Sequence, residues 1–230
     1  MSRQFLAEGL ISPACRPDGL EVWNGNWQAS DEAALRVWHR LLCEGWDIAA
    51  TGGSDLHAVI NDRGLGPGTP TTVVYASALS REAIVDAVRA GRSYVTRHPD
   101  GVELYLTAIG AGGQHTYTGG RLYNVPGSTV TIRVVVRGGN GMRLTVITRK
   151  GPLATIPLDS DDQTVDLTLT MPDRDTFVRA EVRGRTRAAS PLPLLRLDMD
   201  AFTNPIRLLT GAAPDSGASE SDYAPPPPPR

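Results

Sequence analysis

The sequence predicts a largely parallel α/β layer or barrel over residues 1–100 and an antiparallel β-sandwich over residues 101–209. Before Pro99, short apolar runs alternate with segments of helical periodicity, which is typical of strands joined by crossover helices. After Pro99, segments that alternate apolar and polar residues are separated by turn residues, which is typical of a sandwich. Residues 210–230 are rich in Gly, Ala, Ser and Pro, so we expect a disordered, proline-rich tail there.

In the first part, strands are expected at residues 20–23, 47–51, 71–75 and 93–96. A helix follows Ser30 and Asp31, either of which can cap its start, and Gly45 can end it. Its apolar face is formed by residues at helical spacing, namely Ala34, Leu35, Trp38, Leu41 and Leu42. A second helix is expected between Ser80, which caps its start, and Gly91. The order strand, helix, strand over about thirty residues is what a βαβ unit requires.

In the second part, strands are expected at residues 102–109, 129–136, 143–148, 165–169 and 176–182. Glycine-rich and Pro-Gly turns separate these segments, and no helical periodicity interrupts them. A last strand is expected at residues 202–208, with Pro205 tolerated only at a sheet edge or a bulge because proline has no N–H to donate.

Composition excludes several classes of partner. The chain has 230 residues and a net charge of −2, which argues against a general nucleic-acid surface or a polybasic membrane patch. Lys150 is the only lysine, and we interpret the excess of arginine as the coding bias of a GC-rich genome. Cys15 and Cys43 are expected to be free thiols. Since no signal peptide or membrane span is apparent, a cytoplasmic location is the default expectation.

The stretch with the clearest chemistry is Thr51-Gly52-Gly53-Ser54-Asp55-Leu56-His57. It follows an apolar run that reads as a buried strand, and its glycines allow a sharp turn with unusual backbone angles. If the turn stays extended, Asp55 and His57 point to the same side. A carboxylate and an imidazole that converge at a strand end suit a divalent metal such as zinc or manganese. The alternative is an Asp that caps a turn beside a loop histidine.

Two further residues are candidates for substrate binding. Asn24 ends the preceding strand and should lie near the Asp–His pair. Arg92 can contact an anionic substrate group, because a guanidinium matches phosphate or carboxylate geometry; its alternative is a surface arginine at a helix end. The other histidines, His39, His98 and His115, are expected at the surface.

Four separated stretches together resemble one family; they are residues 21–25, 52–57, 90–96 and 203–206. Their order and spacing are similar to the C-terminal part of CehA/McbA-type metallohydrolases of the PHP (polymerase and histidinol phosphatase) superfamily. The resemblance implies a distorted α/β barrel that holds two or three divalent ions. It also implies hydrolysis of small phosphoesters, or of other esters and carbamates. Asp55 and His57 would then correspond to the last two ligands of the metal cluster.

The sequence departs from this family at its start. The family begins with a His-x-His motif on its first strand, whereas no histidine precedes Leu20 here. We therefore expect an incomplete barrel with an incomplete metal site, from a truncated family member with weak or no activity alone. One alternative is a non-catalytic β-sandwich that binds a carbohydrate or a protein. Another is a fragment that completes a separately encoded N-terminal half.

Overall fold

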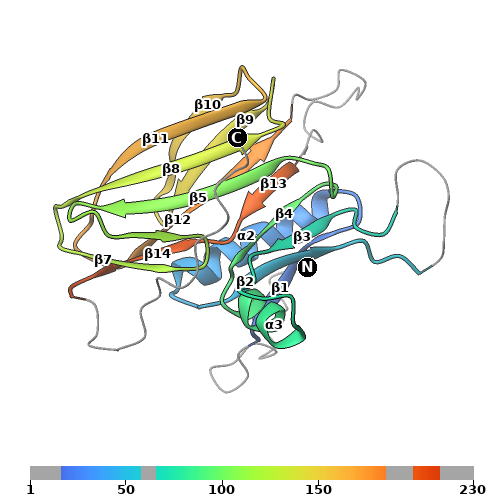
Figure 1. Ribbon diagram of the computed structural model, residues 1–230, viewed down its shortest axis with the longest axis horizontal. Coiled ribbons are helices and arrows are strands. Elements are labelled where there is room, and N and C mark those ends of the chain that lie inside the picture. Colours follow the sequence, from blue (N-terminus) through green and yellow to red (C-terminus); the bar gives the residue numbers. More distant parts are fainter. Residues whose placement is uncertain (1–16, 58–65, 185–198, 213–230) are drawn as a thin grey trace.

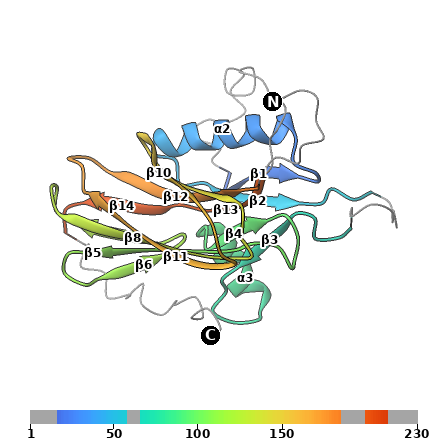
Figure 2. The same cartoon turned by 90° about the horizontal axis from the view of Figure 1, so that it is seen from above.

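The computed structural model describes residues 17–57, 66–184 and 199–212 (Figure 1). These residues form three layers, which Figure 2 shows edge on. A helix with a two-stranded sheet covers one face of an eight-stranded sheet, and a four-stranded sheet covers its other face. Residues 1–16, 58–65 and 185–198, and most of the predicted 210–230 tail, lie outside the described residues.

The outer layer is a βαβ unit, as the sequence predicts. It contains β1 (Gly19–Asn24), α2 (Ala29–Cys43) and β2 (Ala49–Gly53), with β1 and β2 parallel. The helix is capped by Gln28 and not by Ser30 or Asp31. Asp31 occupies the third helical position, where its carboxylate accepts hydrogen bonds from the backbone N–H groups of Gln28 at 2.8 Å and Asn24 at 3.0 Å. Asp31 thereby fastens the helix start to the end of β1.

The middle layer has the strand order β10-β9-β12-β13-β4-β3, and β14 joins β12 to β7. Its strands are β3 (Thr71–Val74), β4 (Ser93–Thr96), β7 (Arg121–Asn124), β9 (Arg143–Thr148), β10 (Gly151–Pro157), β12 (Thr176–Arg183), β13 (Met199–Thr203) and β14 (Ile206–Thr210). A second helix, α3 (Arg81–Arg89), connects β3 to β4. Its predicted cap is present, since Ser80 Oγ accepts a hydrogen bond from Ala83 N at 3.2 Å.

The predicted α/β barrel is wrong. The described residues are mostly strands with two helices, and the sheets are mainly antiparallel. The strands β3 and β4 pair antiparallel although a helix separates them, and β4 also pairs antiparallel with β13 from the end of the chain. The division of the chain near residue 100 stays a prediction, and strands from both sides of it share the eight-stranded sheet.

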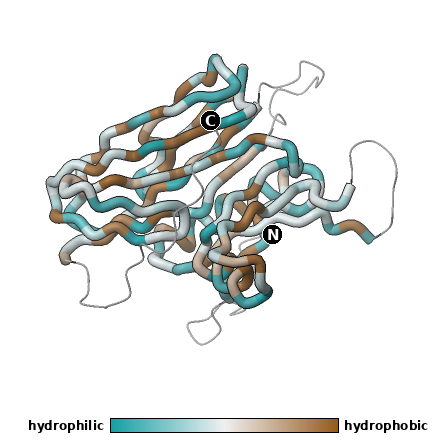
Figure 3. Tube along the Cα trace, viewed as in Figure 1, coloured by the Kyte–Doolittle hydropathy of each residue, from teal (hydrophilic) through white to brown (hydrophobic). Residues whose placement is uncertain are grey.

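The third layer is antiparallel, in the order β11-β8-β5-β6. Its strands are β5 (Glu103–Gly110), β6 (His115–Tyr117), β8 (Thr129–Arg137) and β11 (Asp162–Thr170). Every second residue of β5 is buried, as a strand with one face on a core requires. Figure 3 shows this alternation of hydrophobic and hydrophilic residues along the strands.

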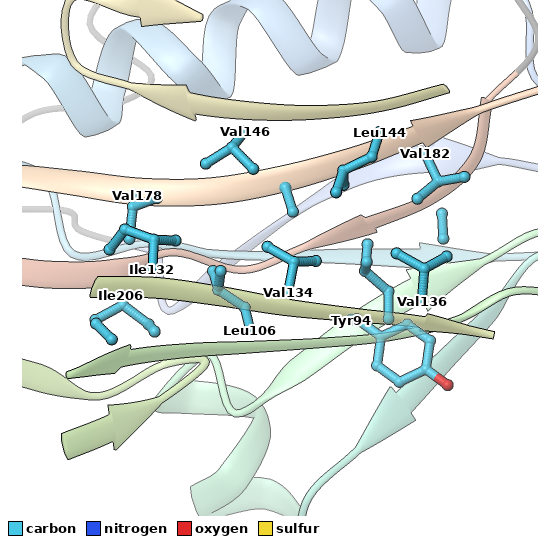
Figure 4. Close-up of a cluster of buried hydrophobic side chains, with 14 of the residues drawn as sticks. Tyr94, Leu106, Ile132, Val134, Val136, Leu144, Val146, Val178, Val182 and Ile206 are labelled. Atoms are coloured by element: carbon cyan, nitrogen blue, oxygen red, sulfur yellow. The ribbon is translucent and has the colours of Figure 1, made fainter. Parts of the chain in front are cut away.

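Two cores hold the layers together. Between the stacked sheets, Leu106, Ile132, Val134, Val146 and Val178 meet in an apolar cluster (Figure 4). The sandwich-like arrangement of the second part agrees with the period-two pattern of the sequence. The second core lies between the βαβ unit and the eight-stranded sheet, and its largest members are Trp23, Trp38, Phe177 and Phe202. Burial of each such side chain contributes about 1.5–3 kcal/mol.

The last strand that the sequence predicts is divided into β13 and β14 by a bulge. In the pairing with β12, Phe202 lies opposite Glu181. Further along, Ile206 lies opposite Val178. Between these two pairs the chain advances four residues along β13 and β14 but only three along β12, so one extra residue forms the bulge. Pro205 sits in this bulge, where its missing N–H removes no ladder hydrogen bond.

Candidate functional site

The structure brings Asp55 and His57 together just beyond the end of β2. Nε2 of His57 lies 3.7 Å from Oδ1 of Asp55, and both side chains are exposed, by 83% and 54%. Two donors on one tetrahedral ion, each about 2.0–2.2 Å from the metal, lie about 3.3–3.6 Å apart. A small rotation of either side chain would therefore let both bind the same ion.

The turn that presents this pair is formed by Asp55 and not by the glycines. Asp55 has a left-handed backbone with φ of 49°, which Asp tolerates better than most residues, whereas neither Gly52 nor Gly53 has positive φ. The prediction of unusual backbone angles at the glycines is wrong. Gly52 is required for packing instead, because a Cβ atom there would lie 2.6 Å from Cγ1 of Val95 and 3.2 Å from Cγ of Pro70.

Asn24 lies beside this turn, opposite Gly53 in the β1–β2 pairing. Its side-chain amide donates a hydrogen bond to Oε2 of Glu21 at 3.1 Å. The other oxygen of Glu21 lies 3.2 Å from the position that a Cβ atom on Gly53 would occupy. Glu21 is therefore a carboxylate at the same sheet edge that sequence reasoning missed. The sequence could have identified Glu21, because it directly precedes two apolar residues of a strand that ends at the site.

The structure does not bring Arg92 to the Asp–His pair. The next residue, Ser93, is joined to Ala50 through hydrogen bonds of the Asn204 side chain. Asp55 lies five residues beyond Ala50, roughly 15 Å along an extended chain. Arg92 therefore lies toward the opposite end of β2, so it does not contact a ligand bound at Asp55.

None of the other histidines joins Asp55 and His57 in a metal-binding group within the described residues. Nδ1 of His98 is 3.7 Å from Oδ2 of Asp100 in an exposed turn, and His115 stacks edge-on against Tyr117. His39 is half-buried between α2 and the eight-stranded sheet, where its ring meets Phe177 at a centroid distance of 5.5 Å. Within the described residues, no group of three or more His, Cys, Asp or Glu side chains is arranged to hold a metal ion.

His39 and Cys43 form a contact on α2 that sequence reasoning did not identify. The Sγ atom of Cys43 lies 3.6 Å from Nε2 of His39. Burial, and then the nearby Arg179 guanidinium, lower the pKa of His39. Burial raises the pKa of the Cys43 thiol, and the positive charge of Arg149 offsets this only in part. A neutral imidazole beside a protonated thiol is not an activated nucleophile.

A buried ionic cluster joins α2 to the eight-stranded sheet. Glu181 accepts hydrogen bonds from Arg179 at 2.6 Å and from Arg183 at 2.9 Å, and Arg183 also bonds to Glu32 of the helix at 3.1 Å. Burial opposes ionisation of Glu181, but the two guanidiniums outweigh it and lower the pKa of this carboxyl. Because every charge is paired, the cluster serves the packing of the layers.

Comparison with known proteins identifies no relative: no protein-family model matches the sequence, and no curated protein matches it. The similarity to CehA/McbA-type metallohydrolases therefore rests on the four motif stretches alone. Among the helices described, none is long and apolar enough to span a membrane.

Proposed function

We propose that this chain contributes Asp55 and His57 as ligands of a divalent metal in a hydrolase for small phosphoesters, other esters or carbamates. The observation that carries the proposal is the 3.7 Å approach of their donor atoms at the C-terminal end of β2. In α/β units, chemistry is typically placed at this end of the parallel strands. The motif resemblance supports the same assignment.

The pair alone makes a weak site. A catalytic zinc site uses about three protein ligands and an open position, so at least one further donor must come from outside the described residues or from a second chain. When bound, the metal would supply Lewis-acid polarisation and a water of lowered pKa. The chain's own residues hold the ion, and Glu21, which holds the Asn24 amide, stands at the same sheet edge. We expect weak binding of Zn²⁺ or Mn²⁺ and little turnover by the chain alone.

The test is calorimetric titration of the chain with Zn²⁺ and with Mn²⁺ at pH 7.5. We expect Asp55→Ala and His57→Ala each to reduce the affinity at least about tenfold. His98 and Asp100 provide a matched control, because they are the same residue types, also exposed, with the same 3.7 Å donor separation. The double substitution His98→Ala, Asp100→Ala should leave the affinity unchanged. If both sets of variants lose the same affinity, Asp55 and His57 are not a special site.

Activity gives a second readout. The chain is assayed with bis(p-nitrophenyl) phosphate, p-nitrophenyl acetate and an aryl carbamate, with Zn²⁺ or Mn²⁺ in excess. We expect slow hydrolysis that Asp55→Ala abolishes and that Asp100→Ala preserves. Rapid turnover that survives Asp55→Ala would show that the hydrolytic centre lies elsewhere.

A further inference from the structure

Two adjoining cavities lie at one end of the sandwich, where β9, β11 and β14 end and β12 begins. The first, of about 180 Å³, includes Arg121, Arg149 and Arg207 in its wall. The second, of about 230 Å³, includes Arg149, Lys150 and Arg174. The cavities share Arg149, Asp175 and Thr176, so they form one continuous depression. We call it the basic groove, defined by Arg121, Arg149, Lys150, Arg174 and Arg207.

The carboxylates of the basic groove are already engaged. Asp47 is paired with Arg121 and lies 3.7 Å from Arg207, so two guanidiniums share one carboxylate. Oδ1 of Asp175 accepts hydrogen bonds from N and Oγ1 of Thr210, at 2.8 and 2.9 Å. Five basic side chains thus face two acidic ones, an excess of three positive charges on a chain whose net charge is −2.

Three cations remain without a carboxylate. Within the part of the chain that the structure describes, Lys150 and Arg174 make no ion pair, and the guanidinium of Arg149 donates only a 3.5 Å hydrogen bond to the backbone carbonyl of Asp175. Like charges that line one small cavity repel each other, and a bound anion would relieve that repulsion. The second cavity has three cations and one carboxylate in its wall, whereas the first has three cations and two carboxylates. The excess of positive charge is therefore greater at the second cavity.

The backbone that carries these cations is held in place. Lys150 lies in the β9–β10 turn, where its N–H donates to Oγ1 of Thr148 and that hydroxyl donates to the carbonyl of Gly151. Arg174 directly precedes Asp175, which is fastened to the end of β14. The charges are thus presented by fixed turns, which lowers the cost of ordering their side chains around a ligand.

We propose that the basic groove binds a tetrahedral oxyanion, as free phosphate or as the phosphoryl group of a small molecule, through Arg149, Lys150 and Arg174. Guanidinium groups match the oxygens of phosphate in a bidentate way, and a lysine adds a point charge. The second cavity, which these three residues line, has a volume of about 230 Å³. This is below the roughly 300–1,000 Å³ of sites for drug-sized ligands and fits an anion of this size.

The basic groove is separate from the proposed metal site. Gly45, which follows α2, lines the groove, whereas Asp31 at the start of α2 bonds to Asn24 beside the metal site. The 15 residues of α2 span about 22 Å between them. An anion in the groove therefore does not contact Asp55 or His57, and either proposal can fail without the other.

The test is a titration of the metal-free chain, in the presence of EDTA, with inorganic phosphate at constant ionic strength and followed by amide NMR. We expect saturable shifts centred on residues 148–151 and 170–176. The variant Lys150→Glu, Arg174→Glu should weaken phosphate binding at least about tenfold. The matched control is Arg36→Glu, Arg143→Glu, which makes the same charge change at exposed arginines outside the groove and should bind phosphate like the wild type.

The identity of the anion is decided by parallel titrations. Glycerol 1-phosphate that binds as well as or better than inorganic phosphate would identify a phosphorylated small molecule as the ligand, and weaker binding would identify the free ion. Acetate and chloride should cause no saturable shifts. The proposal is overturned if acetate acts like phosphate, if both double variants lose phosphate equally, or if no saturable phosphate shifts occur in the groove.

Discussion

The side-chain amide of Asn204 forms hydrogen bonds with both the N–H and the C=O of Ala50, as the backbone of a neighbouring strand would. Its Oδ1 accepts a hydrogen bond from Ala50 N at 2.7 Å, and its Nδ2 donates one to Ala50 O at 2.9 Å. The same Nδ2 group donates to the hydroxyl of Ser93 at 2.9 Å. Asn204 is fully buried. One side chain from the bulge between β13 and β14 thus joins the two-stranded sheet to the eight-stranded sheet.

We predict that Asn204→Ala destabilises the fold by about 3 kcal/mol. The substitution removes the side-chain amide, so the buried N–H and C=O of Ala50 lose their hydrogen-bond partners. The measurement is the free energy of unfolding from urea denaturation. Asn140, which is exposed in a turn, supplies the control, and Asn140→Ala should change stability by less than about 0.5 kcal/mol. Equal stability of the two variants would mean that Asn204 does not join the sheets.

The buried carboxylate of Glu181 gives a prediction about pH. Since Arg179 and Arg183 hold the pKa of Glu181 below its usual value, its stabilising contribution is present above the unfolded pKa, near 4.5. That contribution should disappear as the pH falls below this value toward the lower folded pKa. Unfolding free energies measured from pH 7 to pH 3 should therefore decrease steeply at the acid end.

Glu181→Gln should remove part of this acid dependence. At pH 7 it should destabilise the chain by about 3–5 kcal/mol, because the buried Arg179 is left without a counter-charge. Asp166→Asn is the control: Asp166 pairs with Arg133 at 2.8 Å, but both side chains are about half exposed, so the expected loss is below about 1 kcal/mol. An unchanged acid transition in Glu181→Gln would contradict the assignment.

What the sequence predicts well is local. The cap of α3 at Ser80 and the apolar stripe of α2 depend on residues a few positions apart, and the structure contains both. The sandwich strands follow from period-two alternation for the same reason. Strand direction is different, because it depends on pairing partners that can be remote in the sequence. β4 pairs with β3 and also with β13, which lies more than one hundred residues further along the chain.

The candidate site shows the same division. The sequence places Asp55 and His57 after a strand, and the structure adds that their donor atoms converge. The sequence could not exclude Arg92 from the site, because the position of Arg92 depends on hydrogen bonds between Asn204 and Ala50. These two residues are 154 positions apart in the sequence. The sequence did not reveal the basic groove either, because residues from four separate regions of the sequence form it and its excess of arginine resembles a compositional bias.

Gly52 gives a prediction about packing. A Cβ atom at this position would lie 2.6 Å from Cγ1 of Val95, so Gly52→Ala should cost about 1–3 kcal/mol and displace the turn that presents Asp55. Unfolding free energy and metal affinity should fall together. Gly66→Ala is the matched control, since a Cβ atom there meets no heavy atom within 4 Å and its φ is not positive. A Gly52→Ala variant as stable as Gly66→Ala would refute the tight contact.

Cys43 gives a prediction about reactivity. Burial raises the pKa of its thiol, and the nearby Arg149 lowers it by a smaller amount. Because the thiolate is the reacting form, a raised pKa leaves less of it at pH 8, so reaction with a disulfide reagent should be slower than for the unfolded chain. The rate is measured by thiol-exchange absorbance in a Cys15→Ser background, which leaves Cys43 as the single thiol. Arg149→Ala should slow the reaction further, whereas Arg143→Ala, at the other end of β9 and outside this contact, should not. A faster reaction in Arg149→Ala would show that access to the thiol, and not its charge state, controls the rate.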